Sequence, residues 1–302
     1  MEAGARTHAS APARRWLAAR QILADYVEMT KPKVQSLLLF TTITTMYVAG
    51  TPSIGLVLLT CLGGALASGG AGAINHFIDR DIDARMTRTA NRPVPSGRVA
   101  PWAALTYGIA LGISSFALLA LTVNVLAASL ALSGLLGYVL VYTLWLKRRT
   151  PQNIVIGGAA GAVPPLVAWA AVTGHLSGTA IYLFAIVFYW TPPHFWALSL
   201  LMKDEYASAG VPMLPVVRGE DETRWQILLY TILLVAVTLL PYFFGVFDGL
   251  YLVAALLLGS AFTVMSLKLR RDAARRTALK VYLFSLGYLA LLFAAMVADV
   301  RL

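Results

Sequence analysis

Long apolar runs alternate with short polar connections over most of the chain. A helix needs about 20 apolar residues to cross a bilayer, and each run reaches about that length. The pattern therefore predicts an all-α integral membrane protein with about nine transmembrane helices. The predicted helices cover residues 34–50, 54–77, 101–122, 124–146, 151–173, 178–201, 226–246, 248–268 and 279–298.

The connections between the runs are of two kinds. The segments AGTPS, TGHLSG and GVFDG and the turn near Asn124 contain no lysine or arginine. All of the 24 Lys and Arg residues except Arg301 lie on the other side, in the N-terminal segment and the remaining connections. Basic connections mark the cytoplasmic side. The alternation predicts a cytoplasmic N-terminus and, after nine crossings, a C-terminus outside.

The composition agrees with this prediction. Of the 302 residues, 59% are hydrophobic and 13% are charged, which is rare for a soluble domain. The formal net charge of +10 comes from clusters between apolar runs, as expected beside an anionic lipid leaflet, so we predict a lipid bilayer and no nucleic acid as partner. The single cysteine, Cys61, excludes an intramolecular disulfide.

The N-terminal segment, residues 1–25, is rich in Ala and Arg and has no apolar signal-peptide core, so we expect no cleaved secretory signal. A disordered start followed by an amphipathic interfacial helix is the prediction for it. Residues 26–302 are expected to form one polytopic domain. Because the segment is short and poor in serine, a bacterial inner (plasma) membrane is favoured over the mitochondrial inner membrane.

The most polar stretch is NHFIDRDIDARMTRTANRPVPSGR, residues 75–98. Asn75, Asp79 and Asp83 are spaced four residues apart and share one face of a helix. Carboxylate and amide oxygens in that arrangement suit a hard cation such as Mg²⁺. We expect Arg88 and Arg92, one turn apart before Pro93 ends the helix, to help bind a pyrophosphate. A basic loop that only fixes topology is the alternative, but topology requires no aspartates.

A second polar connection, residues 203–224, opens on the same predicted face. Asp204 and Glu205 are expected to close the sixth apolar helix, followed by a turn that contains proline. Two acidic helix ends that face one another would hold two metal ions with a pyrophosphate between them. Taken alone, an ordinary solvated helix end explains Asp204 and Glu205 better.

His194 lies in YWTPPHFWALSL, inside the sixth apolar run. Pro192 and Pro193 remove two backbone donors and are expected to break or kink the helix. A histidine beside such a break is a functional candidate within a membrane. Ligation of a heme iron or proton transfer is one interpretation, and a hydrogen bond to a freed carbonyl is the other.

These motifs resemble a known family. NxxxDRDID followed by MxRTxxRP resembles the first aspartate-rich motif of the intramembrane prenyltransferases related to the quinone-biosynthetic UbiA enzymes. Within that superfamily, TKPKV, DRDIDARMTRTANRP, WTPPHFWALSL and KDEYASAGVPMLPVV are similar to the protoheme IX farnesyltransferases, or heme O synthases. The resemblance runs from Tyr26 to Leu302. His76 stands where the first motif usually has Asp, and the second motif is sparse, with Asp204 and Tyr206.

The resemblance implies a bundle of nine helices around a central cavity and a magnesium-dependent transfer. The farnesyl group of farnesyl diphosphate would move to a vinyl group of protoheme IX, with addition of water, giving heme O and pyrophosphate for respiratory oxidase assembly. A heme A synthase is a candidate partner. The residues expected at the site are Asn75, Asp79, Asp83 and Asp204 as catalytic residues and Mg²⁺ ligands, Lys31, Arg88, Arg92 and Lys203 as diphosphate-binding residues, and His194 as the heme contact.

Two other functions compete with this one. An aromatic prenyltransferase of the same superfamily, acting on a quinone precursor, would share the metal site and differ in the acceptor. WTPPHFW and the sparse second motif favour heme over that acceptor. A non-catalytic heme-handling transporter is the second alternative. The acids cluster at one membrane face, which suits a diphosphate that enters from the surface better than it suits alternating access.

Overall fold

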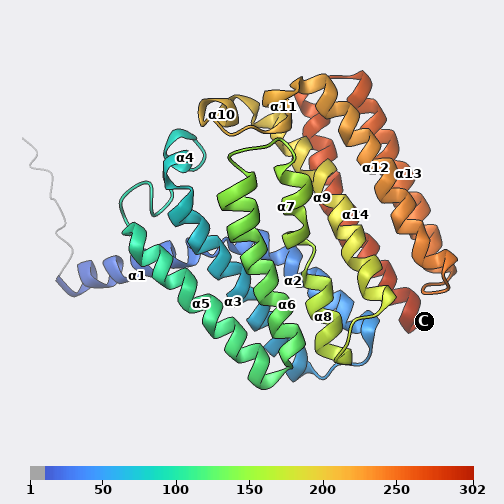
Figure 1. Ribbon diagram of the computed structural model, residues 1–302, viewed down its shortest axis with the longest axis horizontal. Helices are drawn as coiled ribbons and strands as arrows, with labels where there is room; N and C mark the ends of the chain where they lie inside the picture. The colour runs from blue at the N-terminus through green and yellow to red at the C-terminus, as the bar shows by residue number, and fades with distance from the viewer. Residues whose placement is uncertain (1–10) are drawn as a thin grey trace, which may run out of the picture.

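The computed structural model describes residues 11–302 and is built from helices throughout that range (Figure 1). The predicted all-helical bundle is confirmed. Residues 1–10, the first part of the segment 1–25 that is predicted to begin disordered, lie outside the described residues. In chain order the elements are α1 (Ala11–Met29), α2 (Pro32–Ala49), α3 (Ile54–Ile78), α4 (Arg80–Arg85), α5 (Pro101–Thr122), α6 (Val125–Leu136), the π-helical η1 (Gly137–Leu146), α7 (Asn153–Gly161), α8 (Pro164–Thr173), α9 (Gly178–Leu201), α10 (Lys203–Ser208), α11 (Leu214–Val217), α12 (Gly219–Phe243), α13 (Gly249–Arg271) and α14 (Arg275–Arg301).

Seven helical stretches between residues 11 and 302 are long and apolar enough to cross a membrane. The predicted spans 34–50 and 178–201 are also helical, as α2 and α9, but carry more polar residues. A count of nine crossings and the orientation of the two termini stay predictions. The seven stretches are Ile54–Ile78, Pro101–Thr122, Val125–Leu146, Asn153–Thr173, Gly219–Phe243, Gly249–Arg271 and Arg275–Arg301.

Large apolar side chains cover the outside of the bundle. Leu121 is 85% exposed, and Ile54, Trp102 and Leu257 are each more than two-thirds exposed. A water-soluble surface does not carry so many exposed large hydrophobic residues. Together with the seven apolar helices, they make this chain an integral membrane protein whose lateral surface contacts lipid.

Local sequence explains where several helices begin. The Ser53 hydroxyl accepts a hydrogen bond from Leu56 N at 3.2 Å and caps α3, and Asn124 caps α6 in the same way through Ala127 N at 2.8 Å. Proline occupies the first turn of α2, α5 and α8, where no backbone donor is needed. These signals place the starts of α2, α3, α5 and α6 close to the starts of the predicted apolar runs, whereas α8 begins in the middle of the run 151–173.

The core of the bundle is packed around α9, which contacts α7, α8, α12 and α14 (Figure 1). Trp196 of α9 is fully buried together with Tyr251, Phe262, Tyr288 and Phe293 from α13 and α14. α9 continues through Pro192 and Pro193, so of the predicted break or kink the break is wrong, and the kink stays a prediction. Neighbouring helices in a membrane bundle compensate for the two missing donors.

The short helices α4, α10 and α11 and the α13–α14 turn lie at one end of the bundle, which we call the polar end (Figure 1). α4 stops at Arg85, so the prediction that Arg88 and Arg92 follow on the same helix is wrong. Met86 is extended, and the Thr89 hydroxyl donates to the Asp83 carbonyl at 2.9 Å, which replaces the next helical bond.

The second polar connection also differs from its prediction. α9 ends at Leu201, and Met202 breaks the helix with φ −121° and ψ 19°. Asp204 and Glu205 therefore do not close the long helix but lie in the first turn of α10, where acidic residues favourably face the helix dipole.

Candidate functional site

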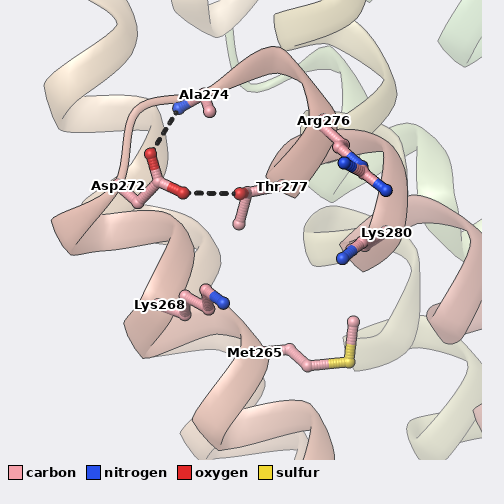
Figure 2. A pocket seen from close by; sticks show the side chains of 7 residues that line it. All are labelled: Met265, Lys268, Asp272, Ala274, Arg276, Thr277 and Lys280. Carbon is pink, nitrogen blue, oxygen red and sulfur yellow. Dashed lines mark hydrogen bonds between the residues drawn. The ribbon is translucent and has the colours of Figure 1, made fainter.

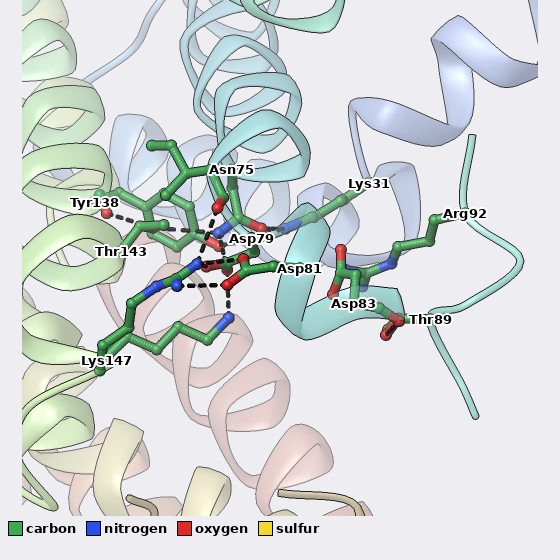
Figure 3. Close-up of polar contacts among 12 residues, drawn as sticks. Lys31, Asn75, Asp79, Asp81, Asp83, Thr89, Arg92, Tyr138, Thr143 and Lys147 are labelled. Carbon is green, nitrogen blue, oxygen red and sulfur yellow. Dashed lines mark hydrogen bonds and ion pairs between the residues drawn. The ribbon is translucent and has the colours of Figure 1, made fainter. Parts of the chain in front are cut away.

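Asn75 and Asp79 come together where α3 ends at the polar end. Asp79 N donates to Asn75 O at 2.9 Å and Asp83 N to Asp79 O at 2.8 Å, so the helical spacing predicted from the sequence persists across the α3–α4 junction. The three side chains are almost fully buried. Asn75 Nδ2 donates to Asp79 Oδ2 at 2.7 Å (Figure 3). An apolar helix thus ends in a buried amide–carboxylate pair.

Asp79 is paired with basic residues that sequence reasoning did not assign to the site. The Lys147 amine contacts Asp79 Oδ2 directly, and Arg148 Nη2 lies 3.6 Å from Oδ1. Asp79 has no exposed surface, and its Oδ1 atom has no hydrogen-bond donor among the described residues. A buried carboxylate oxygen without a donor is costly unless a cation satisfies it.

Lys31 completes the same cluster from the connection between α1 and α2. Its Nζ donates to Asn75 Oδ1 at 2.6 Å and lies 3.4 Å from the Tyr138 hydroxyl. Burial, followed by the positive charges of Arg92 and Lys147, lowers the pKa of the Lys31 amine to about 7. An anion bound beside Lys31 would favour the charged amine and would therefore raise its pKa. We refer to Lys31, Asn75, Asp79, Thr143 and Lys147 as the Asn75 cluster.

Lys31 also has an unusual backbone. With φ 56° and ψ 55° it is the one non-glycine residue with positive φ in the described part of the chain. For an L-residue the left-handed conformation costs about 1–2 kcal/mol. It turns the chain sharply into α2, where Pro32 follows, and it aims the amine at Asn75.

The π-helical segment η1 supplies the opposite wall of the cluster. Lys147 N donates to Tyr142 O at 2.8 Å, and the Thr143 hydroxyl donates to Tyr138 O at 2.9 Å, each five residues back. Thr143 also accepts from Asn75 Nδ2 at 3.3 Å. The wider turn brings Tyr138, Thr143 and Lys147 toward α3. Segments of π-helix are rare and often mark functional sites.

Two further acids of the first polar stretch carry their own ion pairs. Arg92 Nη1 donates to both oxygens of Asp83, at 2.8 and 2.7 Å. Arg148 grips Asp81 through two nitrogens at 2.8 and 2.7 Å, and this hydrogen bonding lowers the pKa of the Asp81 carboxyl to about 2. In Figure 3 the Asp83–Arg92 pair is set apart from the Asn75 cluster.

The oxygen atoms of Asn75, Asp79 and Asp83 suit a hard divalent cation. Asn75 Oδ1, Asp79 Oδ1, which accepts no hydrogen bond from the described residues, and the Asp83 carboxylate are the oxygen ligands that Mg²⁺ prefers. Among the described side chains, no three of His, Cys, Asp and Glu gather around one point, and Asp83 and Asp79 face Arg92 and Lys147. The oxygen atoms of Asn75, Asp79 and Asp83 fit a magnesium ion by their chemistry, and the same basic residues would pair with a phosphate that accompanied it.

The second polar connection shares a hydrophobic cluster with Ile82 and Met86 of the first and is joined to it by a hydrogen bond. Glu205 Oε2 accepts a hydrogen bond from Arg88 N at 3.3 Å, while the Arg88 side chain is exposed. Asp204 is exposed and makes no side-chain hydrogen bond or ion pair to the described residues, and Lys203 pairs with Glu220 at 3.1 Å. The structure thus unites Lys31 with Asn75 and Asp79 but leaves Lys203 and Asp204 outside the Asn75 cluster.

His194 forms a separate buried site between α9 and α14. Its Nδ1 lies 2.7 Å from the Ser285 hydroxyl, and its ring is stacked between Trp190 at 4.3 Å and Tyr282 at 4.8 Å. Ser285 Oγ donates to Tyr282 O at 2.6 Å, which uses its only proton. Ser285 therefore accepts from His194 Nδ1–H, and Nε2 keeps its lone pair. The partner of His194 is a hydroxyl and not the freed carbonyl predicted as one interpretation.

The family becomes clear from comparison with known proteins. The model of the UbiA prenyltransferase family matches residues 38–292, which is most of the chain. The chain belongs to the UbiA prenyltransferase family. The predicted resemblance is confirmed. Within this UbiA family member the matched residues include His194 and every member of the Asn75 cluster except Lys31, which precedes the match.

Two relatives of this UbiA chain are named protoheme IX farnesyltransferase. The protein from Symbiobacterium thermophilum is 53% identical over 96% of this chain and 98% of its own length. The protein from Roseiflexus sp. (strain RS-1) is 56% identical over 92% of this chain and 52% of its own length. The chain thus spans about half the length of several curated relatives that it matches.

Solved structures confirm the UbiA fold. A digeranylgeranylglyceryl phosphate synthase superposes with a TM-score of 0.76 at 20% identity, covering 92% of this chain and 98% of that one. A UbiA homolog from Archaeoglobus fulgidus, bound to DMAPP and Mg²⁺, superposes with a TM-score of 0.62 at 16% identity, covering 90% of this chain and 99% of that one.

Proposed function

We propose that this protein transfers the farnesyl group of farnesyl diphosphate to a vinyl group of protoheme IX and that water adds to give heme O. The observation that carries the proposal is the Asn75 cluster, a buried Asn–Asp pair surrounded by Lys31 and Lys147 at the end of an apolar helix. The heme acceptor is supported by relatives named protoheme IX farnesyltransferase, one of which matches over almost its whole length.

The diphosphate end of the substrate would bind at the polar end of the bundle. Asn75, Asp79 and Asp83 are the proposed Mg²⁺ ligands, with Asp204 joining from α10. A diphosphate needs more positive charge than one metal ion supplies, and Lys31, Arg92, Arg88 and Lys203 are the proposed cations. Lys147 and Arg148, which already touch Asp79, belong with them. The A. fulgidus homolog is bound to DMAPP and Mg²⁺, which supports a metal-dependent reaction but does not identify the residues.

The chemistry divides between charge stabilisation and shape. When bound, Mg²⁺ supplies a Lewis acid that favours diphosphate as a leaving group. Lys31 and Lys147 are fixed in advance by Asn75 and Asp79, so they stabilise the negative charge that grows on the diphosphate as the C–O bond breaks. The vinyl group attacks the allylic carbon, the new cation beside the porphyrin ring takes up water, and a proton is released.

His194 is the proposed heme contact. The Ser285 hydroxyl holds Nδ1–H, so Nε2 has the free lone pair that an iron ligand or a proton acceptor needs. Aromatic rings on both faces of the imidazole, Trp190 and Tyr282, fix its plane. The site lies in the apolar core, where a porphyrin would be shielded from water.

The substrate pair fits a membrane enzyme because both the isoprenoid chain and the porphyrin are poorly soluble in water. We propose the bacterial inner membrane as its location, with the polar end in the cytoplasm. A heme A synthase, which would consume the product, is the proposed partner.

The decisive experiment incubates purified protein with protoheme IX, farnesyl diphosphate and Mg²⁺ and separates the hemes by chromatography with mass detection. We expect a heme heavier by one farnesyl group plus water, with pyrophosphate released, and no product when Mg²⁺ is chelated. Release of pyrophosphate only with an aromatic acid in place of heme would make the protein an aromatic prenyltransferase. Heme binding without either product would favour a heme-handling transporter.

A further inference from the structure

A cavity of about 430 Å³ opens between α13 and α14 at the polar end (Figure 2). Lys268 from α13 and Arg276 and Lys280 from α14 line it, and Met265 forms part of its wall. None of these residues belongs to the Asn75 cluster or to the His194 site. The cavity is therefore a basic pocket that the proposed reaction does not use.

The positive charge of this pocket is not balanced by the acid beside it. Asp272 lines the pocket but is used by the backbone of its own turn, since its carboxylate accepts from Ala274 N at 3.2 Å and from the Thr277 hydroxyl at 2.9 Å. Figure 2 shows this carboxylate directed at the start of α14. Within the described residues, Lys268, Arg276 and Lys280 make no ion pair. An anion entering the pocket would meet three cations and one occupied carboxylate.

The depth of the pocket in the membrane follows from the residues below it. Val264 and Leu267 of α13 and Leu279 and Leu283 of α14 are large, apolar and 38–64% exposed, as expected of side chains that face acyl chains. Val264 lies one turn deeper than Lys268 on α13, and Leu283 lies one turn deeper than Lys280 on α14, while Leu267 and Leu279 lie at the level of the two lysines. Lys and Arg at such a boundary extend their charges toward the headgroups while their stems stay among apolar groups.

We infer that this pocket binds the phosphate of an anionic phospholipid from the leaflet at the polar end. A basic pocket between transmembrane helices suits a lipid phosphate, and the Arg276 guanidinium can hold two phosphate oxygens at once. The apolar side chains below the pocket would contact the acyl chains of the same lipid. This contact favours a lipid over free inorganic phosphate, which has the same charge chemistry but gains nothing from Val264 or Leu283.

Two arginines near the pocket serve as a control for electrostatic attraction that does not depend on the pocket. Arg271 and Arg275 lie in the same α13–α14 turn, are exposed and do not line the pocket. The pairs Arg276→Gln/Lys280→Gln and Arg271→Gln/Arg275→Gln therefore remove the same charge from the same segment. Only the first pair removes it from the pocket.

The test measures phosphatidylglycerol retained by the full chain in neutral detergent, by native mass spectrometry, with phosphatidylcholine as the reference lipid. We expect Arg276→Gln/Lys280→Gln to lower phosphatidylglycerol affinity about tenfold or more and the control pair to lower it less than about threefold. Thermal unfolding of both variants verifies that they are folded. Equal losses in the two pairs would mean that the attraction is diffuse and would overturn the proposal.

A competition arm distinguishes the two sources of phosphate. Inorganic phosphate in excess should leave most of the bound phosphatidylglycerol in place, because free phosphate makes no contact with the apolar side chains. If inorganic phosphate alone binds as tightly, with the same dependence on Arg276 and Lys280, the pocket is a phosphate site and the lipid assignment is wrong.

Discussion

The Ser285 hydroxyl accepts a hydrogen bond from His194 Nδ1 at 2.7 Å because its own proton is directed to Tyr282 O. This relationship joins α9 to α14 and determines which nitrogen of the buried imidazole is free. If His194 contacts the heme, Ser285 is a positioning residue that acts through it. A partner of this kind typically changes metal affinity about 10–100-fold when it is removed.

Ser285→Ala should therefore weaken heme binding by about tenfold and shift the heme absorption spectrum, whereas His194→Ala should remove the specific spectrum altogether. Ser285→Thr keeps the hydroxyl and should restore most of the affinity. Ser266→Ala is the matched control, because Ser266 is also a fully buried serine, bonded to Thr231 at 3.0 Å on another helix. A heme spectrum unchanged in His194→Ala would return His194 to a structural role.

Removing Asp79 should affect activity and stability for different reasons. Asp79→Ala should lower turnover by about a hundredfold or more, since it deletes a proposed metal ligand and the group that fixes Lys147. It also leaves Lys147, which is 13% exposed, without its acceptor, and breaking a buried pair in this way costs about 3–5 kcal/mol.

The double variant Asp79→Ala/Lys147→Ala separates the two effects. It should recover part of the lost thermal stability, because no buried charge remains unpaired, and it should stay inactive. Turnover near that of the original protein in either variant would exclude Asp79 from the metal site.

Two glycines of α3 test how closely this helix packs on α5. A Cβ atom on Gly70 would lie 2.7 Å from the Gly108 carbonyl oxygen, and backbone cannot move aside easily. Gly70→Ala should destabilise the protein by about 1–3 kcal/mol and disturb Asn75 one turn further on. Gly64→Ala, on the same helix with nothing within 4 Å of the added atom, should keep or slightly raise the melting temperature. Equal melting temperatures for the two variants would contradict the close packing of α3 and α5.

Glu205 and Asp204 are neighbours with different expected roles. Glu205→Gln weakens the bond to Arg88 N and should make the first polar stretch more sensitive to trypsin at Arg85 and Arg88. Asp204→Asn should leave this sensitivity unchanged and lower magnesium-dependent turnover. If only Glu205→Gln reduced turnover, the metal assignment would have to move from Asp204 to Glu205.

Residue patterns within one helix predicted much of the site. The four-residue spacing of Asn75 and Asp79 was sufficient to predict their contact, because a helix fixes which side chains share a face. The apolar runs predicted the long helices for the same reason. Arg88 and Arg92 were misplaced because Thr89 bonds the Asp83 carbonyl and ends α4 early, which is a side-chain choice that helix propensity does not contain.

Contacts between distant segments could not be predicted in this way. Lys147 follows Asp79 by 68 residues, and the sequence alone assigns residues 147–149 to membrane topology. Only the packing of η1 against α3 shows that these residues also serve the acids. The contact between Ser285 and His194 could not be predicted either, because it depends on the packing of α14 against α9.

The ion pairs on Asp79 and Asp83 determine how the binding of a metal ion affects the binding of a diphosphate. Each carboxylate already has a counterion in the protein, so a divalent cation alone must displace Lys147 or Arg92, and an anion alone must take these cations from the aspartates. When both arrive, each provides a partner for the groups released by the other. Metal and diphosphate should therefore bind with positive cooperativity, and each should raise the measured affinity of the other by the same factor.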